Sequence, residues 1–256
     1  MIPIKSPEEI KIMMEGGRIL AGVMKEIEKQ VKPGVATKEL DKVAQDLVLR
    51  LGAKPAFLGY VDEKDKSSKP FPAGLCTSIN EEIVHTLPSS RVLKEGDIIT
   101  LDFGVFYKDF YTDMAITLPV GKVSPEVQRL IRVTKKALKR GIKKARVGNT
   151  FGDIGNTIQR YVEDQGFGVV RELCGHGIGK KLHEDPQIPN YGKRRSGPEL
   201  AEGMVFCLEP MVTVGDWKLK KSRDDFGLAT KDGSLSAHFE DTLAIINGRA
   251  QILTKI

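Results

Sequence analysis

The sequence has no long apolar run, few cysteines and no signal-peptide pattern. No stretch of its 256 residues approaches the roughly 18 consecutive apolar residues that a membrane helix needs. Charged side chains already occur within the first ten residues, so the apolar region of a signal peptide is absent. Three cysteines (Cys76, Cys174 and Cys207) without a Cys-x-x-Cys pair argue against a disulfide framework and a zinc ribbon. We therefore expect a cytoplasmic protein with buried thiols and no membrane association.

Positive charge is in moderate excess and is unevenly spread. The formal net charge is +6, and Lys and Arg concentrate in residues 129–146 and 193–195. The simplest interpretation is the solvated face of a helix plus an exposed loop. A second interpretation is weak attraction to an anionic surface such as RNA, which would allow a weak ribosome contact. No RNP, KH or zinc-finger motif accompanies the charge, which argues against a dedicated nucleic-acid reader.

Capping signals and apolar spacing predict four long helices, at residues 6–30, 37–51, 124–145 and 150–165. Ser6 and Ser124 are each followed by Pro and Glu, a pattern typical of a helix N-terminus. Gly52 and Gly166 follow the second and fourth helices. The run of charges and serines at residues 62–70 predicts a solvated loop.

Short motifs of the first half return in the same order in the second half. Lys-Pro-Gly at residues 32–34 is answered by Arg-Val-Gly at 146–148, each before a predicted helix. Glu-Gly, an apolar run and an acid occur at residues 95–102 and again at 202–209. No stretch resembles an interdomain linker. We therefore expect an α+β fold, with a single domain over residues 1–256 made of two similar halves, about 1–122 and 123–256, that face each other.

Acidic and imidazole side chains stand beside apolar runs that read as strands buried on at least one face. The five residues are Asp102, Asp113, His176, Glu209 and Glu240. Four carboxylates in one core would repel each other, and each would carry a desolvation penalty of roughly several kcal/mol. Two divalent cations would cancel the four charges and use the imidazole as a further ligand. This predicts a two-metal hydrolytic site of Mn, Fe, Co or Zn, and disfavours a closed structural zinc site.

Asp102 and Asp113 are expected on consecutive strands of a hairpin. If its centre is Tyr107-Lys108, Asp102 lies opposite Asp113, with Cα atoms roughly 4.5–5.5 Å apart. Tyr-Lys is poor chemistry for a two-residue turn, so a longer loop with a shifted register stays open. His176 lies in Gly-His-Gly-Ile-Gly, where glycines allow backbone and ligand to approach closely.

Together these segments resemble the bacterial-type (type I) methionine aminopeptidases over essentially the whole chain. The segments that carry the resemblance are residues 4–8, 31–34, 78–85, 102–113, 174–186, 209–211 and 234–240. The interval from His183 to Glu209 is too short for the helical insertion of the type II enzymes. The resemblance implies a duplicated pita-bread α+β fold and a metal-dependent hydrolase. Its expected activity is removal of the N-terminal methionine from nascent proteins and peptides, with a preference for a small second residue.

The resemblance also implies roles for individual residues. The five residues above would bind two divalent metal ions, and a water activated by these ions would attack the first peptide bond. Glu209 would act in addition as the general base. His183 would stabilise the tetrahedral intermediate, and His85 would hydrogen-bond the substrate. Six further residues match positions that shape the methionine pocket, with ordinary core packing as the alternative for some of them: Phe57, Tyr60, Phe71, Cys76, Leu182 and Phe226.

The sequence departs from the family pattern at a few places. Thr86, Leu182 and Asp241 stand where Gly, an aromatic residue and His are common, and residues 62–69 resemble an added loop before the pocket. None of these is an expected ligand, so they bear on pocket shape and rate.

Two other functions stay open. A proline-specific peptidase of the same fold would share all five ligands, but it would normally carry a further histidine where Lys180-Lys181 stands. A non-catalytic pita-bread protein that uses its basic surface on RNA or a ribosome would have lost ligands, whereas this chain keeps them. We expect a monomer.

Overall fold

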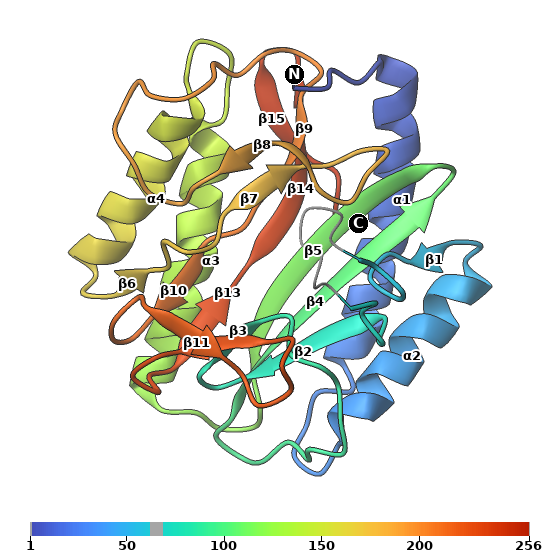
Figure 1. Cartoon of the computed structure of the whole chain (residues 1–256), viewed down its shortest axis with the longest axis vertical. Helices are drawn as coiled ribbons and strands as arrows, with labels where there is room; N and C mark the ends of the chain where they lie inside the picture. Colours follow the sequence, from blue (N-terminus) through green and yellow to red (C-terminus); the bar gives the residue numbers. More distant parts are fainter. Residues whose placement is uncertain (1, 62–68, 256) are drawn as a thin grey trace.

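A nine-stranded antiparallel sheet forms the centre of the molecule (Figure 1). The structure, a computed structural model, describes residues 2–61 and 69–255, so most of the predicted 62–70 loop lies outside the described residues. The main path of the sheet runs in the order β1 (Lys54–Pro55), β4 (Ile98–Tyr107), β5 (Phe110–Pro119), β14 (Glu240–Ile246), β9 (Val205–Leu208), β7 (Gly175–Gly177) and β8 (Glu184–Ile188). Two further strands, β2 (Leu75–Ile79) and β15 (Arg249–Ile252), pair with β4 and β14.

Two small antiparallel sheets adjoin the central one. The first contains β13 (Ser236–His238), β10 (Met211–Thr213) and β6 (Gly168–Val169), and the second β11 (Leu219–Lys221), β12 (Leu228–Thr230) and β3 (Glu82–Val84). Only Phe239 separates β13 from β14, so His238 at the end of β13 lies close to Glu240 at the start of β14.

The four predicted helices are confirmed as α1 (Pro7–Glu28), α2 (Thr37–Arg50), α3 (Pro125–Lys144) and α4 (Phe151–Asp164). Ser6 caps α1 in a capping box with Glu9, and the Ser124 side chain caps α3. In Figure 1 the pair α1 and α2 lies at the right of the view and the pair α3 and α4 at the left, and both pairs pack against the same face of the sheet. Among the described residues, no helix combines the length and apolarity needed to cross a membrane.

Alternate residues of the central strands point to two different environments, as strand geometry requires. Leu101 and Phe103 of β4 are fully buried with side chains of α1 and α2. Phe206 and Leu208 of β9 are buried with side chains of α3 and α4. The residues between them, such as Asp102, point to the opposite side. We call this side the open face, and it is the side on which the acidic residues gather.

The β4–β5 hairpin has a different register from the one predicted with its centre at residues 107–108. Its two-residue turn consists of Lys108 and Asp109, with φ of 46° and 66°, one residue later than expected. Positive φ at both central residues matches the twist of the strands, and Asp tolerates it. Asp102 therefore pairs with Ala115, and the predicted pairing with Asp113 is wrong. The observed partner of Asp102 is two residues from the predicted one. Because side chains alternate between the two faces of a strand, the carboxylates of Asp102 and Asp113 still lie on the same, open face.

Matching turns recur in the two halves of the chain. Gly34 and Gly148 have φ of 94° and 85° and precede α2 and α4. Gly96 and Gly203 have φ of 92° and 79° and precede β4 and β9. The repeated motifs of the sequence therefore form the same kind of turn at equivalent places. The boundary between the halves near residue 122 stays a prediction.

Candidate metal centre

Three carboxyl groups project onto the open face from three neighbouring strands. Asp102 of β4 lies opposite Ala115 of β5, and Ala115 lies opposite Glu240 of β14. Asp113 is two residues from Ala115 along β5 and therefore points to the same face. Carboxyl oxygens of the three acids lie within 4.8 Å of one another. The small Ala115 side chain between the acids leaves space for them to converge.

Glu209 and His176 reach the same place from β9 and β7. Glu209 directly follows β9, and the Asn190 side-chain amide donates a hydrogen bond of 2.9 Å to its carbonyl oxygen. His176 Nε2 lies 3.6 Å from Glu209 Oε1. Nδ1 of His176 is 2.9 Å from the carbonyl oxygen of Gly177, which can only accept, so Nδ1 carries the proton. Nε2 of His176 is then free to act as a metal ligand.

The glycines on either side of His176 permit this packing. A Cβ atom at Gly175 would collide with the carbonyl oxygen of Cys207, and one at Gly177 with the carbonyl oxygen of Asp185. The prediction that glycines allow close backbone approach here is confirmed.

Burial perturbs every ionisable group of the centre. It raises the pKa of Asp113 to about 7. It also raises the pKa values of Asp102, Glu209 and Glu240 well above their usual range, and neighbouring carboxylates add to the effect. Burial lowers the pKa of His176 to about 4, so its imidazole is neutral at pH 7.

The donor atoms fit divalent cations. Among the described residues, Asp102 Oδ1, Glu240 Oε1 and both ring nitrogens of His238 are buried without a hydrogen-bond partner. Such orphaned polar atoms are rare and destabilising in protein interiors. Carboxylate oxygens with imidazole nitrogens are suitable ligands for Mn, Fe, Co and Zn.

Sequence reasoning gave no role to His238, which the structure brings into the centre. Its side chain is only 1% exposed. Nε2 of His238 lies 3.8 Å from Glu209 Oε2 and 4.0 Å from Glu240 Oε2. One signal in the sequence could have found it: His238 stands two residues before Glu240, a spacing that puts both side chains on one face of an extended chain.

Two exposed histidines stand at the rim of the centre. The ring of His183 lies 4.4 Å from the ring of His176, and Tyr60 Oη is 2.6 Å from His183 Nδ1. A positive charge on His85 would lower the pKa of both His176 and His238, which places His85 close to the buried ligands.

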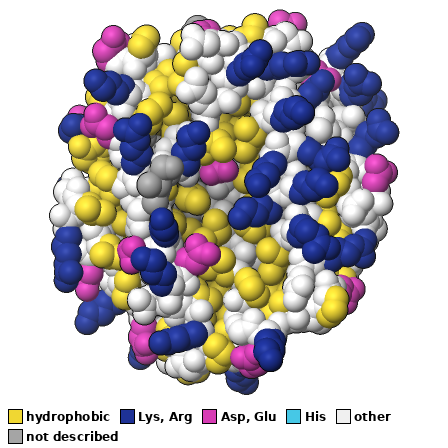
Figure 2. All heavy atoms as spheres, turned by 180° about the vertical axis from the view of Figure 1, so that it is seen from behind, with side chains coloured by type: hydrophobic (Ala, Val, Ile, Leu, Met, Phe, Trp, Pro, Cys, Tyr) yellow, Lys and Arg dark blue, Asp and Glu magenta, His cyan; other side chains and the backbone are white. Residues whose placement is uncertain are grey.

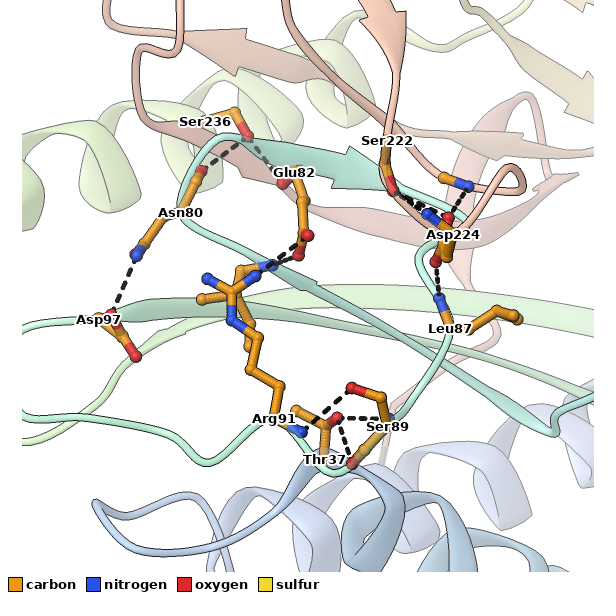
Figure 3. Close-up of polar contacts among 12 residues, drawn as sticks. Thr37, Asn80, Glu82, Leu87, Ser89, Arg91, Asp97, Ser222, Asp224 and Ser236 are labelled. Atoms are coloured by element: carbon orange, nitrogen blue, oxygen red, sulfur yellow. Dashed lines mark hydrogen bonds and ion pairs between the residues drawn. The ribbon is translucent and has the colours of Figure 1, made fainter.

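Side-chain hydrogen bonds hold the segment that carries His85, whose φ is 60° (Figure 3). The backbone N–H of Leu87 donates to Asp224 Oδ2 at 2.6 Å. The backbone N–H of Ser89 donates to Thr37 Oγ1 at 2.8 Å. The segment is thus tied to α2 on one side and to the β11–β12 connection on the other. These contacts stabilise a backbone conformation that a non-glycine residue seldom adopts.

An ion pair ties the N-terminal segment to the loop of His183. Lys5 Nζ lies 2.5 Å from Glu184 Oε2, and the two side chains are only 5% and 10% exposed. Glu184 Oε1 accepts a second hydrogen bond, of 3.1 Å, from the backbone N–H of Lys181. A Cβ atom at Gly179 would collide with the Lys5 side chain, so glycine makes room for the pair.

The six predicted pocket residues belong to a single apolar cluster. Phe57, Phe71, Cys76 and Leu182 are buried in it, while Tyr60 and Phe226 are partly buried against it. The ring of Phe71 contacts both Phe57 and Phe226 edge-on, with centroid distances of 6.4 and 5.7 Å. Cys76 of β2 lies opposite Asp102 of β4, so this cluster adjoins the carboxyl groups.

The unusual residue Asp241 lies outside the centre. It pairs with Met114 and Leu208 and points to the helix-covered side of the sheet. Its carboxyl group accepts a hydrogen bond of 2.9 Å from Thr254 Oγ1, and burial raises its pKa to about 6.

Comparison with known proteins identifies the family. The model of metallopeptidase family M24 matches residues 11–247. The chain belongs to metallopeptidase family M24. Like other members of this family, it is a peptide-bond hydrolase that uses divalent metal.

Similar family members are named methionine aminopeptidases. That of Clostridium acetobutylicum is 46% identical, and the match covers 99% of each chain. Methionine aminopeptidase 1 of Bacillus subtilis is 44% identical over the full length of both. The crystal structure of the Thermotoga maritima methionine aminopeptidase has a TM-score of 0.94 and 41% identity, and it covers both chains completely. The predicted pita-bread fold is thereby confirmed.

Proline-specific peptidases of known structure are less similar. The Xaa-Pro dipeptidase of Bacillus anthracis has a TM-score of 0.76 at 23% identity. This match covers 99% of the present chain but only 62% of the dipeptidase. The likeness shows the shared fold alone.

Proposed function

We propose that this chain removes the N-terminal methionine from peptides and nascent proteins by hydrolysing the first peptide bond. The observation that carries the proposal is a buried set of metal-ligand atoms on the open face, next to an apolar cluster and under two exposed histidines. The full-length similarity to methionine aminopeptidases supports the same activity.

Five residues would hold two divalent ions of Co, Mn, Fe or Zn: Asp102, Asp113, His176, Glu209 and Glu240. Their four carboxylates would balance the charge of two such ions. When bound, the ions would polarise the scissile carbonyl and lower the pKa of water.

Side chains of the centre and rim would move protons and orient the substrate. Burial raises the pKa of Glu209, which makes its carboxylate a stronger proton acceptor than an exposed one. When the Tyr60 hydroxyl donates to Nδ1 of His183, Nε2 of that ring carries a proton. This N–H can donate to the oxygen that becomes negative in the transition state. His85 would hydrogen-bond the substrate near the same bond.

The apolar cluster would select methionine. Its members offer aromatic and aliphatic surface and one thiol, and none of them carries a charge that could pair with a basic or acidic side chain. An unbranched, flexible thioether fills such a space well. Each missing or misplaced methylene group of another side chain would lose roughly 1–3 kcal/mol of transition-state binding.

Peptide turnover tests the proposal. We expect efficient hydrolysis of Met-Ala and Met-Gly peptides, poor hydrolysis of Leu-Ala, and almost none of Met-Lys or Met-Phe, measured as kcat/KM with added Mn²⁺ or Co²⁺. Preference for Leu-Ala, or indifference to the second residue, would contradict it. Turnover of Xaa-Pro peptides in place of Met-Ala would favour the proline-specific alternative.

We also propose that the chain acts as a cytoplasmic monomer with a weak ribosome contact. Lys and Arg gather over the side of the molecule that carries α3 and α4 (Figure 2). A surface groove of about 580 Å³ along α3 is lined by Arg132, Lys135, Lys136 and Lys139. Two of these cations, Lys135 and Lys136, also lie over aromatic rings, as expected for an ordinary solvated face. We expect the chain to cosediment with ribosomes, and we expect this binding to weaken steeply with added salt. Replacing the three lysines with Glu should abolish it.

A further inference from the structure

His238 is buried in a way that ordinary packing does not explain. Neither Nδ1 nor Nε2 has a hydrogen-bond partner among the described residues, and both atoms are closed off from solvent. A structural histidine in a protein core normally donates from one nitrogen and accepts at the other. Leaving both unpaired destabilises the fold unless something else binds them.

Hydrogen bonds hold the backbone at His238. The backbone N–H of His238 donates to Thr117 Oγ1 at 2.8 Å, and the same hydroxyl donates to the carbonyl oxygen of His238 at 2.8 Å. Thr117 in turn lies 2.8 Å from the hydroxyl of Thr100. His238 also pairs with Met211 in the small sheet. These contacts from two sheets fix the backbone position from which the imidazole projects.

The distances from Nε2 to its neighbours are wrong for hydrogen bonds and suitable for ligands of a shared ion. At 3.8 Å to Glu209 and 4.0 Å to Glu240, Nε2 is beyond hydrogen-bond range of either carboxylate. Two ligand atoms that each bind one cation at about 2.0–2.2 Å lie roughly 3–4 Å apart. Donor atoms of Glu209, His238 and Glu240 all lie within 4.8 Å of one another.

We propose that His238 is a sixth protein ligand of the metal centre, with Nε2 joining Glu209 and Glu240 to bind one divalent cation. This inference rests on the proposed metal-dependent function and adds a nitrogen ligand to it. The centre then has two imidazoles, from His176 and His238. The added nitrogen favours Co²⁺ and Zn²⁺ over Mn²⁺ and Mg²⁺.

The groups that face the ring of His238 are the carboxyls of Glu209 and Glu240 and the rim residue His85.

Nitrogen NMR of the whole protein tests the assignment without any measurement of activity. The chain has four histidines, so ¹⁵N-histidine labelling gives a simple ¹H–¹⁵N spectrum of the ring nitrogens. On addition of Zn²⁺ we expect the Nε2 signals of His176 and His238 to move to metal-bound positions, while those of His85 do not. Movement of His176 with no movement of His238 would overturn the inference and leave the proposed function intact. If no histidine moves and calorimetry detects no Zn²⁺ binding, the proposed function itself fails.

A matched pair of variants gives a second measurement. His238→Gln keeps a polar side chain of similar size but removes the imidazole, and it should weaken Zn²⁺ binding by at least about tenfold in calorimetry. His85→Asn is the control, because Asn tolerates the positive φ of that position, and it should bind Zn²⁺ as the unchanged protein does. Equal Zn²⁺ affinity of His238→Gln and the unchanged protein would contradict the proposal. If His238→Gln does not fold, the NMR experiment decides alone.

Discussion

Removal of divalent ions should lower the stability of this protein more at pH 7 than at pH 5. The reason lies in the buried carboxyl groups of the open face. Burial raises the pKa of Asp113 from 3.8 to about 7 in the folded protein, whereas the unfolded chain returns it to its ordinary value. Between these two pH values the ion-free folded state holds a proton that the unfolded state has lost. The free energy of unfolding therefore falls as the pH rises through this window.

The size of the effect follows from linkage. One proton held only by the folded state changes the free energy of unfolding by about 1.4 kcal/mol per pH unit. From pH 5 to pH 7 Asp113 alone then accounts for a loss of ~2–3 kcal/mol. Asp102, Glu209 and Glu240 act in the same direction, because their pKa values are raised as well. For a chain of this size the loss corresponds to a fall in Tm of roughly 5–10 °C.

Calorimetry of the protein with chelator and with saturating Mn²⁺, each at pH 5 and pH 7, measures this difference. Bound cations keep the carboxylates ionised at both pH values, so the Tm of the loaded protein should change much less and serves as the reference. Asp113→Asn removes one titrating group and should flatten the pH dependence of the chelated protein. A chelated protein whose Tm is equal at the two pH values, or higher at pH 7, would refute the reasoning.

Three substitutions test other parts of the site. Glu209→Ala should abolish turnover of Met-Ala peptides in a folded protein, since it removes both a ligand and the proposed base. The control Glu39→Ala, on the exposed side of α2, should leave turnover unchanged. Substantial activity of Glu209→Ala under metal-controlled conditions would contradict the proposed site. Lys5→Met should lower the free energy of unfolding by roughly 3–5 kcal/mol in chemical unfolding, because it leaves the buried carboxylate of Glu184 without its cation. A decrease of less than about 1 kcal/mol would show that the ion pair contributes little to stability. Tyr60→Phe should lower kcat about 10- to 100-fold with little change in Zn²⁺ affinity, since it removes the hydrogen bond from Tyr60 to Nδ1 of His183. An unchanged kcat would exclude this positioning role.

Local signals predicted the helices well because their causes are local. Ser6 with Glu9 forms a capping box within one turn, and such contacts need no other part of the chain. The apolar spacing of α2 likewise appears in the structure as one buried face of the helix.

The register of the β4–β5 hairpin was harder to predict from the sequence. The structure places Lys108 and Asp109 in the positive-φ turn, although neither is the Gly or Asn that usually marks it. The register depends on which side chains of β4 and β5 are buried under α1 and α2, and on the pairing of β5 with β14. Sequence patterns in the hairpin alone contain none of this information.

The sequence by itself predicted the chemistry of the site: acids and a histidine stand beside strands that are too apolar to accept them without cations. That inference needed only the desolvation of charge and the two-residue period of a strand. The tertiary structure alone decided which atoms meet. β14 inserts between β5 and β9, segments far apart in the chain, and this pairing brings Glu240 opposite Ala115 and beside Asp102. It also brings His238 from a different sheet, through a backbone held by Thr117, to within 4.0 Å of Glu240. Such contacts depend on long-range pairing and burial, which the local pattern of residues does not determine.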